Sequence, residues 1–217
     1  MKKQILRKLY IGLGLLLLFV LWTVALRFFD AEAIGPKGTI VGFSTLNKAV
    51  HSITGVHMWL YTVTDWLGLV PICFIMGFGL FGLAQWIKRK NPFKVDSSIL
   101  ALGVFYIILM TIYIFFEIFV VNYRPILING YLEASYPSST TMLVMCVMPT
   151  ALIQFNIRIR NMLLRRSIYC AIIFFIAFMV IGRLISGVHW LSDIIGGALL
   201  SGGLVTLYGF VCDIMKK

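Results

Sequence analysis

The chain has 217 residues, of which 60% are hydrophobic and 12% are charged, and its mean hydropathy is +0.96. A soluble domain normally carries about twice that share of charged residues, so the composition excludes a soluble globular protein. The net charge of +11 does not indicate nucleic-acid binding, because the basic residues are spread over short segments between apolar runs. The sequence therefore predicts an all-α, polytopic integral membrane protein.

Charged residues delimit six long uncharged intervals, each near the roughly 20 residues that a helix needs to cross a bilayer. The fifth interval is short and is expected to continue past Arg183. We predict a six-transmembrane-helix bundle that forms a single membrane domain over residues 1–217. The intervals are Lys8 to Arg27, Asp65 to Lys88, Asp96 to Glu117, Glu133 to Arg158, Arg166 to Arg183 and Asp193 to Asp213.

The basic residues predict the orientation of these spans. Most of the 19 Lys and Arg residues fall on the side that holds both termini of a six-span chain. Because cytoplasmic loops are enriched in Lys and Arg, both termini are expected in the cytoplasm, and the other loops outside the plasma membrane. The residues on the terminal side are Lys2, Lys3, Arg7, Lys8, Lys88, Arg89, Lys90, Lys94, Arg158, Arg160, Arg165, Arg166, Lys216 and Lys217.

The longest outer segment, residues 28–65, follows the first span. Its later part, Ser44 to Trp66, mixes apolar residues with Lys48, His51 and His57 and is expected to lie along the membrane surface as an amphipathic helix. Such a helix would either guide a lipid headgroup or simply rest at the headgroup level.

A second outer segment, residues 122–140, carries Arg124 and ends in a helix start. Pro137 fixes the start of the helix, and Ser138, Ser139 and Thr140 supply hydroxyls and free N–H groups in its first turn. A helix N-terminus of this kind binds anions, although a capped helix that merely enters a membrane has the same sequence pattern.

The third outer segment, GRLISGVHWLSD, places Arg183, His189 and Asp193 within eleven positions. If the chain is helical from Val188, His189 and Asp193 share one face, so the carboxylate can hold one imidazole nitrogen while the other nitrogen faces a substrate. Gly187 predicts a break between two helices. A histidine here is also compatible with a simple interfacial residue, but two arginines, a helix N-terminus and an oriented imidazole together can hold and attack a phosphoryl group.

These residues resemble the motifs of the type-2 phosphatidic acid phosphatases, which share their site with the vanadium-dependent haloperoxidases. That family has Lys, six residues, Arg-Pro; then Pro-Ser-Gly-His; then Ser-Arg, five residues, His, three residues, Asp. Here Arg124-Pro125 is similar to the end of the first motif, Pro137-Ser138 to the start of the second, and Arg183, His189 and Asp193 to the third. The resemblance covers about residues 59–211.

The resemblance implies a role for each matching residue. His189 would be the nucleophile that forms a phosphohistidine, and Asp193 would orient it. Arg124, Arg183 and Ser138 would bind phosphate, and no metal or cofactor is implied. We include the neighbouring hydroxyls of Ser139 and Thr140 in the predicted phosphate site.

Three positions depart from the family pattern. Glu117 stands at the first-motif Lys, Gly182 at the third-motif Ser, and Ser139-Thr140 at the second-motif Gly-His. That His protonates the leaving group in the family, and His51 and His57 are the remaining histidines available to replace it.

The sequence thus favours a membrane lipid phosphatase that acts on a lipid phosphate or diphosphate. The missing acid favours a diphosphate, and polyprenyl diphosphate in particular, because a phosphate leaving group departs without being protonated. Two alternatives stay open: a weak or inactive relative that binds or moves lipid phosphates, and a lipid-phosphate phosphotransferase.

Overall fold

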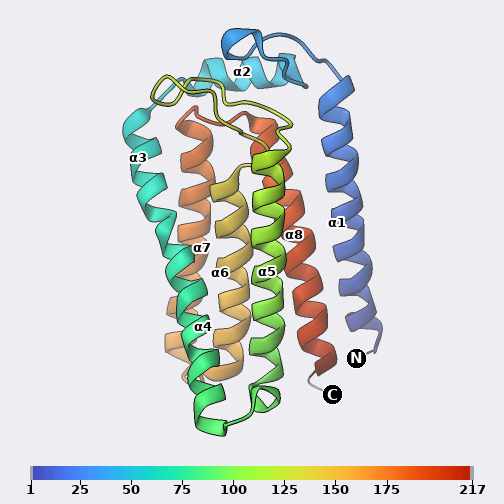
Figure 1. Cartoon of the computed structure of the whole chain (residues 1–217), viewed down its shortest axis with the longest axis vertical. Helices are drawn as coiled ribbons and strands as arrows, with labels where there is room; N and C mark the ends of the chain where they lie inside the picture. The colour runs from blue at the N-terminus through green and yellow to red at the C-terminus, as the bar shows by residue number, and fades with distance from the viewer. Residues whose placement is uncertain (1, 216–217) are drawn as a thin grey trace.

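Six helices of the computed structural model, which describes residues 2–215, are long and apolar enough to cross a membrane. The predicted all-α class and the six spans are therefore confirmed, and the chain is a multi-span membrane protein (Figure 1). The spans are α1 (Lys2–Phe28), α3 with α4 (Met58–Leu67 and Leu69–Arg89), α5 (Ser97–Ile118), α6 (Ser139–Arg158), α7 (Met162–Ile185) and α8 (Leu191–Met215). The shorter elements are η1 (Pro36–Gly38), α2 (Ser44–Thr54) and η2 (Pro92–Lys94).

The ends of two spans can be compared with the uncharged intervals in the sequence. The fifth continues past Arg183 to Ile185, as predicted. The fourth begins at Ser139 with Ser138 as its N-cap residue, so the helix start predicted at Pro137 to Thr140 is confirmed. Residues 133–138 belong to the loop between α5 and α6.

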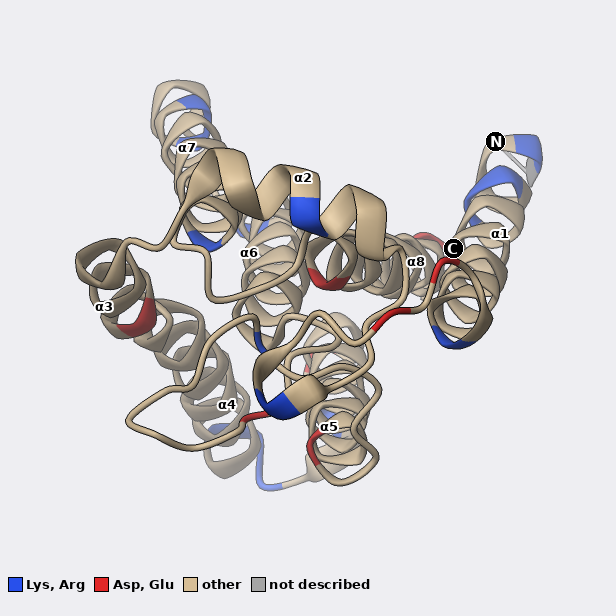
Figure 2. Ribbon diagram, turned by 90° about the horizontal axis from the view of Figure 1, so that it is seen from above, with Lys and Arg blue, Asp and Glu red and all other residues tan. Residues whose placement is uncertain are grey.

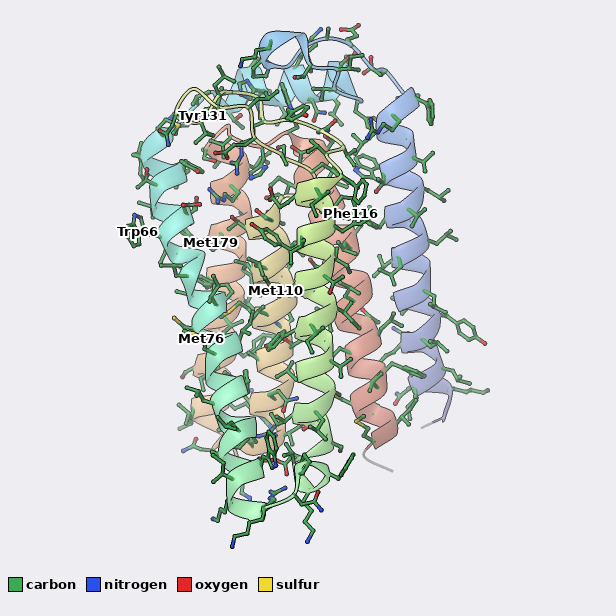
Figure 3. The ribbon with its side chains drawn as sticks, viewed as in Figure 1. Trp66, Met76, Met110, Phe116, Tyr131 and Met179 are labelled. Carbon is green, nitrogen blue, oxygen red and sulfur yellow. The ribbon has the colours of Figure 1, made fainter. Side chains whose placement is uncertain are left out.

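Helix α6 lies in the middle of the bundle, between α7, α8 and α5 (Figure 1). It is the most buried of the six spans. Its side chains enter both hydrophobic clusters, one with α1, α5 and α8 and the other with α7. Met179 of α7 is a buried member of this second cluster, whereas Trp66 of α3 points away from the bundle (Figure 3).

Helix α1 packs mainly on α8, so the first and the last spans are neighbours. Near the termini, Lys8 Nζ lies 2.6 Å from Asp213 Oδ2. At the other end, Trp22 Nε1 donates to the Ser192 carbonyl at 3.1 Å. Both termini lie at the end of the bundle opposite α2 (Figure 1).

Helix α2 lies across one end of the bundle of spans (Figures 1 and 2). A helix forms at residues 44–54, as predicted, and its position at the membrane surface stays a prediction. The prediction of a surface helix is wrong for residues 58–66, which form α3 and continue into α4 across Gly68 as the second span. Gly55, with a φ of +67°, ends α2 and turns the chain into the membrane.

Candidate active site

His189 lies in the turn between α7 and α8. The predicted break at Gly187 is confirmed, since this residue has a φ of +70°. A Cβ at Gly187 would lie 1.9 Å from the Gly55 carbonyl oxygen, so only glycine allows the turn to pack against the end of α2. The expected helix from Val188 is wrong, because α8 begins at Leu191 and His189 precedes it. The turn, rather than a shared helix face, positions the imidazole.

Ser135 lies between His189 and Asp193. Its Oγ is 3.0 Å from His189 Nδ1 and donates to Asp193 Oδ2 at 2.5 Å. The sequence predicted direct contact between carboxylate and imidazole, whereas in the structure the carboxylate reaches the ring through a hydroxyl. All three residues are buried.

Asp193 accepts two further hydrogen bonds, from Asn122 Nδ2 at 3.2 Å and from the Trp190 backbone N–H at 2.9 Å. Asp193 thus accepts from three donors and donates in none of these contacts. The same contacts join the turn, the start of α8 and the loop that follows α5. Asp193 therefore fixes the backbone that follows the histidine and ties it to the loop between α5 and α6.

Arg183 and Arg124 approach the same aromatic ring. The Arg183 guanidinium lies 5.0 Å and the Arg124 guanidinium 5.8 Å from the Tyr61 ring centre. Arg183 donates from Nη2 to Asp65 Oδ1 at 2.9 Å and to Thr140 Oγ1. Arg124 Nε lies 3.0 Å from Glu133 Oε2. The two groups form an ion pair without a hydrogen bond between these atoms. Each arginine thus has one carboxylate neighbour, which offsets part of its charge.

Several polar atoms at this site are buried without a hydrogen-bond partner among the described residues. An unpaired buried polar group costs about 1–3 kcal/mol, and more if it is charged, so a cluster of them needs an explanation. A bound anion that accepts from the donors would supply one. The atoms are Nη1 of Arg124, Nε and Nη1 of Arg183, Oγ of Ser138, Oγ1 of Thr141 and Nε2 of His189.

The surroundings of His189 favour its neutral form. Burial, followed by the positive charges of Arg124 and Arg183, lowers the pKa of the imidazole well below 6.5. A neutral imidazole has one bare nitrogen, which can act as a nucleophile. Nε2 has no hydrogen-bond partner among the described residues. Because both arginines act electrostatically on the ring, this free nitrogen and the unpaired arginine donors belong to one cluster.

Helix α2 holds the His189 turn from outside. Asn47 Nδ2 donates to Ser192 Oγ at 2.9 Å, and the Ser192 N–H donates to Asn47 Oδ1 at 3.1 Å. His51 Nε2 is 3.1 Å from the Gly187 carbonyl, and the His57 backbone N–H donates to the Ser186 carbonyl at 3.0 Å. His51 therefore uses one ring nitrogen to hold the turn, while the His57 side chain is exposed.

The three positions that depart from the motifs, Gly182, Glu117 and Thr140, each have a distinct environment in the structure. A Cβ at Gly182 would lie 2.9 Å from Thr64 Cγ2, so the close approach of α3 to α7 favours glycine where the family has Ser. Glu117, near the end of α5, interacts electrostatically with Arg124 and lines a small cavity with Ser135 and Ser139. Thr140, at the position of the missing acid, accepts from Arg183.

The structure brings the predicted residues Arg124, Ser138, Thr140, Arg183, His189 and Asp193 to one end of the bundle, and Ser139 beside them in the first turn of α6. Sequence reasoning missed the supporting residues Asn47, Asp65, Asn122, Glu133 and Ser135. Their only signal in the sequence was that each is a polar residue of segments 28–65 and 122–140, which were predicted to lie on the same side of the bundle as the third motif.

The fold defines a multi-span membrane protein, and this cluster gathers two buried arginines and a buried histidine at one end of the bundle. The profile of the PAP2 superfamily matches residues 119–212, the part that holds both arginines, His189 and Asp193. The predicted resemblance is thus confirmed for that segment.

A solved structure has the same fold. The chain is similar to the transmembrane PAP2-type phosphatidylglycerolphosphate phosphatase from Bacillus subtilis, with a TM-score of 0.65 and 16% sequence identity. The alignment covers 94% of this chain and 97% of that one. A comparison with curated protein sequences gave no match.

Proposed function

We propose that the protein is a lipid phosphatase that hydrolyses a lipid phosphate or diphosphate through a phosphohistidine on His189. The observation that carries the proposal is the buried, unpartnered Nε2 of His189 beside unpartnered donors of Arg124 and Arg183. The match to the PAP2 superfamily supports it. The basic residues near the termini support a site on the extracytoplasmic face of the plasma membrane.

The reaction would proceed in two displacements. In the first, the Nε2 lone pair forms a bond to phosphorus, and the leaving oxygen departs with the electron pair of its P–O bond. Arg124, Arg183 and the N–H groups at the start of α6, beside Ser138, would stabilise the charge on the other phosphoryl oxygens. In the second, water attacks phosphorus, the P–N electron pair returns to Nε2, and the water proton passes to solvent.

The substrate preference follows from the leaving group. Thr140 lies where the family has an acidic imidazole, so an alcohol, whose pKa is near the 15.7 of water, would have to leave without that proton donor. The leaving group of a diphosphate is a phosphate monoester whose second pKa is roughly 6. We therefore favour a lipid diphosphate, with polyprenyl diphosphate as the leading candidate.

The test is release of orthophosphate by the purified protein in detergent micelles. The panel is a polyprenyl diphosphate, its monophosphate, phosphatidic acid and phosphatidylglycerolphosphate, the last because the structural relative is named for it. We expect release from the diphosphate that is lost in His189→Ala. Equal release by wild type and His189→Ala would refute covalent catalysis, and binding without release would indicate an inactive relative.

A further inference from the structure

The hydroxyl of Ser135 connects the imidazole of His189 to the carboxylate of Asp193. It is 2% exposed, and it contacts both a ring nitrogen of His189 and a carboxylate oxygen of Asp193. Its backbone is fixed as well, because the Ser135 N–H donates to the Asn122 carbonyl at 2.9 Å. The next residue, Tyr136, is buried, and its Oη lies 2.6 Å from Thr23 Oγ1 of α1. The hydroxyl is therefore held in place by the loop and by the first span.

Counting protons fixes the direction of both hydrogen bonds. A serine hydroxyl has one proton, and in this geometry Ser135 donates it to Asp193 Oδ2. The Asp193 carboxyl has no proton to give back, since Asn122, Trp190 and Ser135 all donate to it. The contact between Ser135 Oγ and His189 Nδ1 can then be a hydrogen bond only if Nδ1 carries the imidazole proton.

We propose that Ser135 is a positioning residue that sets the tautomer of His189, an inference that rests on the proposed function of His189 as nucleophile. With its proton on Nδ1, the neutral imidazole has its lone pair on Nε2, the atom that is buried without a partner. The opposite tautomer would place an N–H there and leave no nucleophile. Ser135 thus selects the reactive form before any substrate arrives.

The hydroxyl also transmits the charge of Asp193 during the reaction. When Nε2 bonds to phosphorus the ring becomes cationic, and its Nδ1–H donates more strongly to Ser135 Oγ. That oxygen is a better acceptor because its own proton is donated to a carboxylate. No proton has to change atoms, so Asp193 stabilises the cation through the hydroxyl while remaining ionised.

The tautomer can be measured without any substrate. The chain has three histidines, so protein labelled with 15N in its histidine rings gives three imidazole patterns in a two-dimensional 15N NMR spectrum. His51→Gln and His57→Gln variants assign the pattern of His189 by elimination. We expect Nδ1–H for wild-type His189 and a new Nε2–H population in Ser135→Ala. Ser135→Thr retains the hydroxyl and should retain the wild-type pattern.

The matched control is Ser52→Ala on α2, whose hydroxyl donates only within its own helix. It should leave the His189 pattern unchanged. If Ser135→Ala does not fold, Ser135→Cys replaces it, because the weak thiol donor should also release the tautomer. An Nε2–H pattern in wild type, or an unchanged pattern in the folded Ala or Cys variant, would overturn the proposal.

An activity measurement separates this inference from the proposed function. Ser135→Ala should lower kcat at least tenfold with little change in KM, and Ser135→Thr should recover most of the loss. If wild type shows the Nδ1–H pattern but releases no phosphate from any substrate, the proposed function fails and the positioning role stands. If phosphate is released while Ser135→Ala keeps its tautomer and its kcat, the positioning role fails alone.

Discussion

Replacement of Arg183 by lysine would retain the charge and still remove most of the phosphate contact. Arg183 is 2% exposed, and its Nη2 is already used by Asp65 and Thr140, which leaves Nε and Nη1 for a ligand. A lysine has one nitrogen, so it can pair with Asp65 or contact phosphate, but it cannot reproduce both sets of bonds.

The loss can be estimated from those two free donors. Hydrogen bonds to charged groups contribute about 1.5–3 kcal/mol each, so losing both would cost roughly 3–6 kcal/mol of transition-state stabilisation. At about 1.4 kcal/mol per tenfold change, kcat/KM should fall roughly 10²- to 10⁴-fold.

The assay is orthophosphate release from the preferred lipid in detergent micelles, with kcat/KM measured for each variant. Arg27→Lys is the matched control, because Arg27 lies at the same end of the bundle and donates to the Val120 carbonyl at 3.1 Å. We expect the control to keep wild-type activity, and size-exclusion chromatography should show both variants folded. A fall of less than about threefold in Arg183→Lys would refute the assignment of its free donors to phosphate.

Four further predictions concern the same site. Asp193→Asn should retain some activity where His189→Ala retains none, because Ser135 and the Trp190 N–H can still donate to an amide oxygen; equal losses would contradict this. Orthovanadate, which imitates the pentavalent phosphorus of the transition state, should inhibit phosphate release and EDTA should not, so a requirement for added magnesium would contradict the proposed chemistry. In an NMR titration, burial and the two arginines should keep the His189 ring neutral through pH 6.5, and a titration midpoint of this ring at or above 6.5 would refute this. The free energy of unfolding should therefore decrease as pH falls below 6.5, because the unfolded chain gains a proton there that the folded chain excludes. Thr140→His should raise hydrolysis of lipid monophosphates more than of diphosphates, and an equal rise in both would remove the leaving-group argument.

The spans were predictable because a bilayer imposes a length on uncharged segments, and six such segments occur in this chain. The errors arose where polar and apolar residues mix. Residues 58–66 contain Asp65 and aromatic residues, which suggested a surface helix, yet they form α3, which continues into α4 across Gly68 as one span. The start of the fourth span had to be predicted from Pro137 and the hydroxyl residues that follow it, because no charge lies between Glu133 and Arg158.

The third motif could be predicted because its residues are close in sequence. Ser135 could not be, since its contact with His189 spans 54 residues and depends on the path of the outer loop. The same applies to Asn47, whose partner Ser192 is 145 residues away. Sequence spacing reports neighbours within one helix, whereas these contacts arise only when loops from different spans meet.

The pairing of the first span with the last has a consequence for biogenesis. Transmembrane helices insert one by one and associate afterwards, so α1 has to wait in the bilayer without its main partner until α8 has been synthesised. During that interval Lys8 has no Asp213 beside it, and the Trp22 indole has no Ser192 carbonyl to donate to. A chain truncated before α8 would therefore contain five spans of correct sequence and still expose the inner face of α1 to lipid, a state that membrane quality control can distinguish from the finished protein.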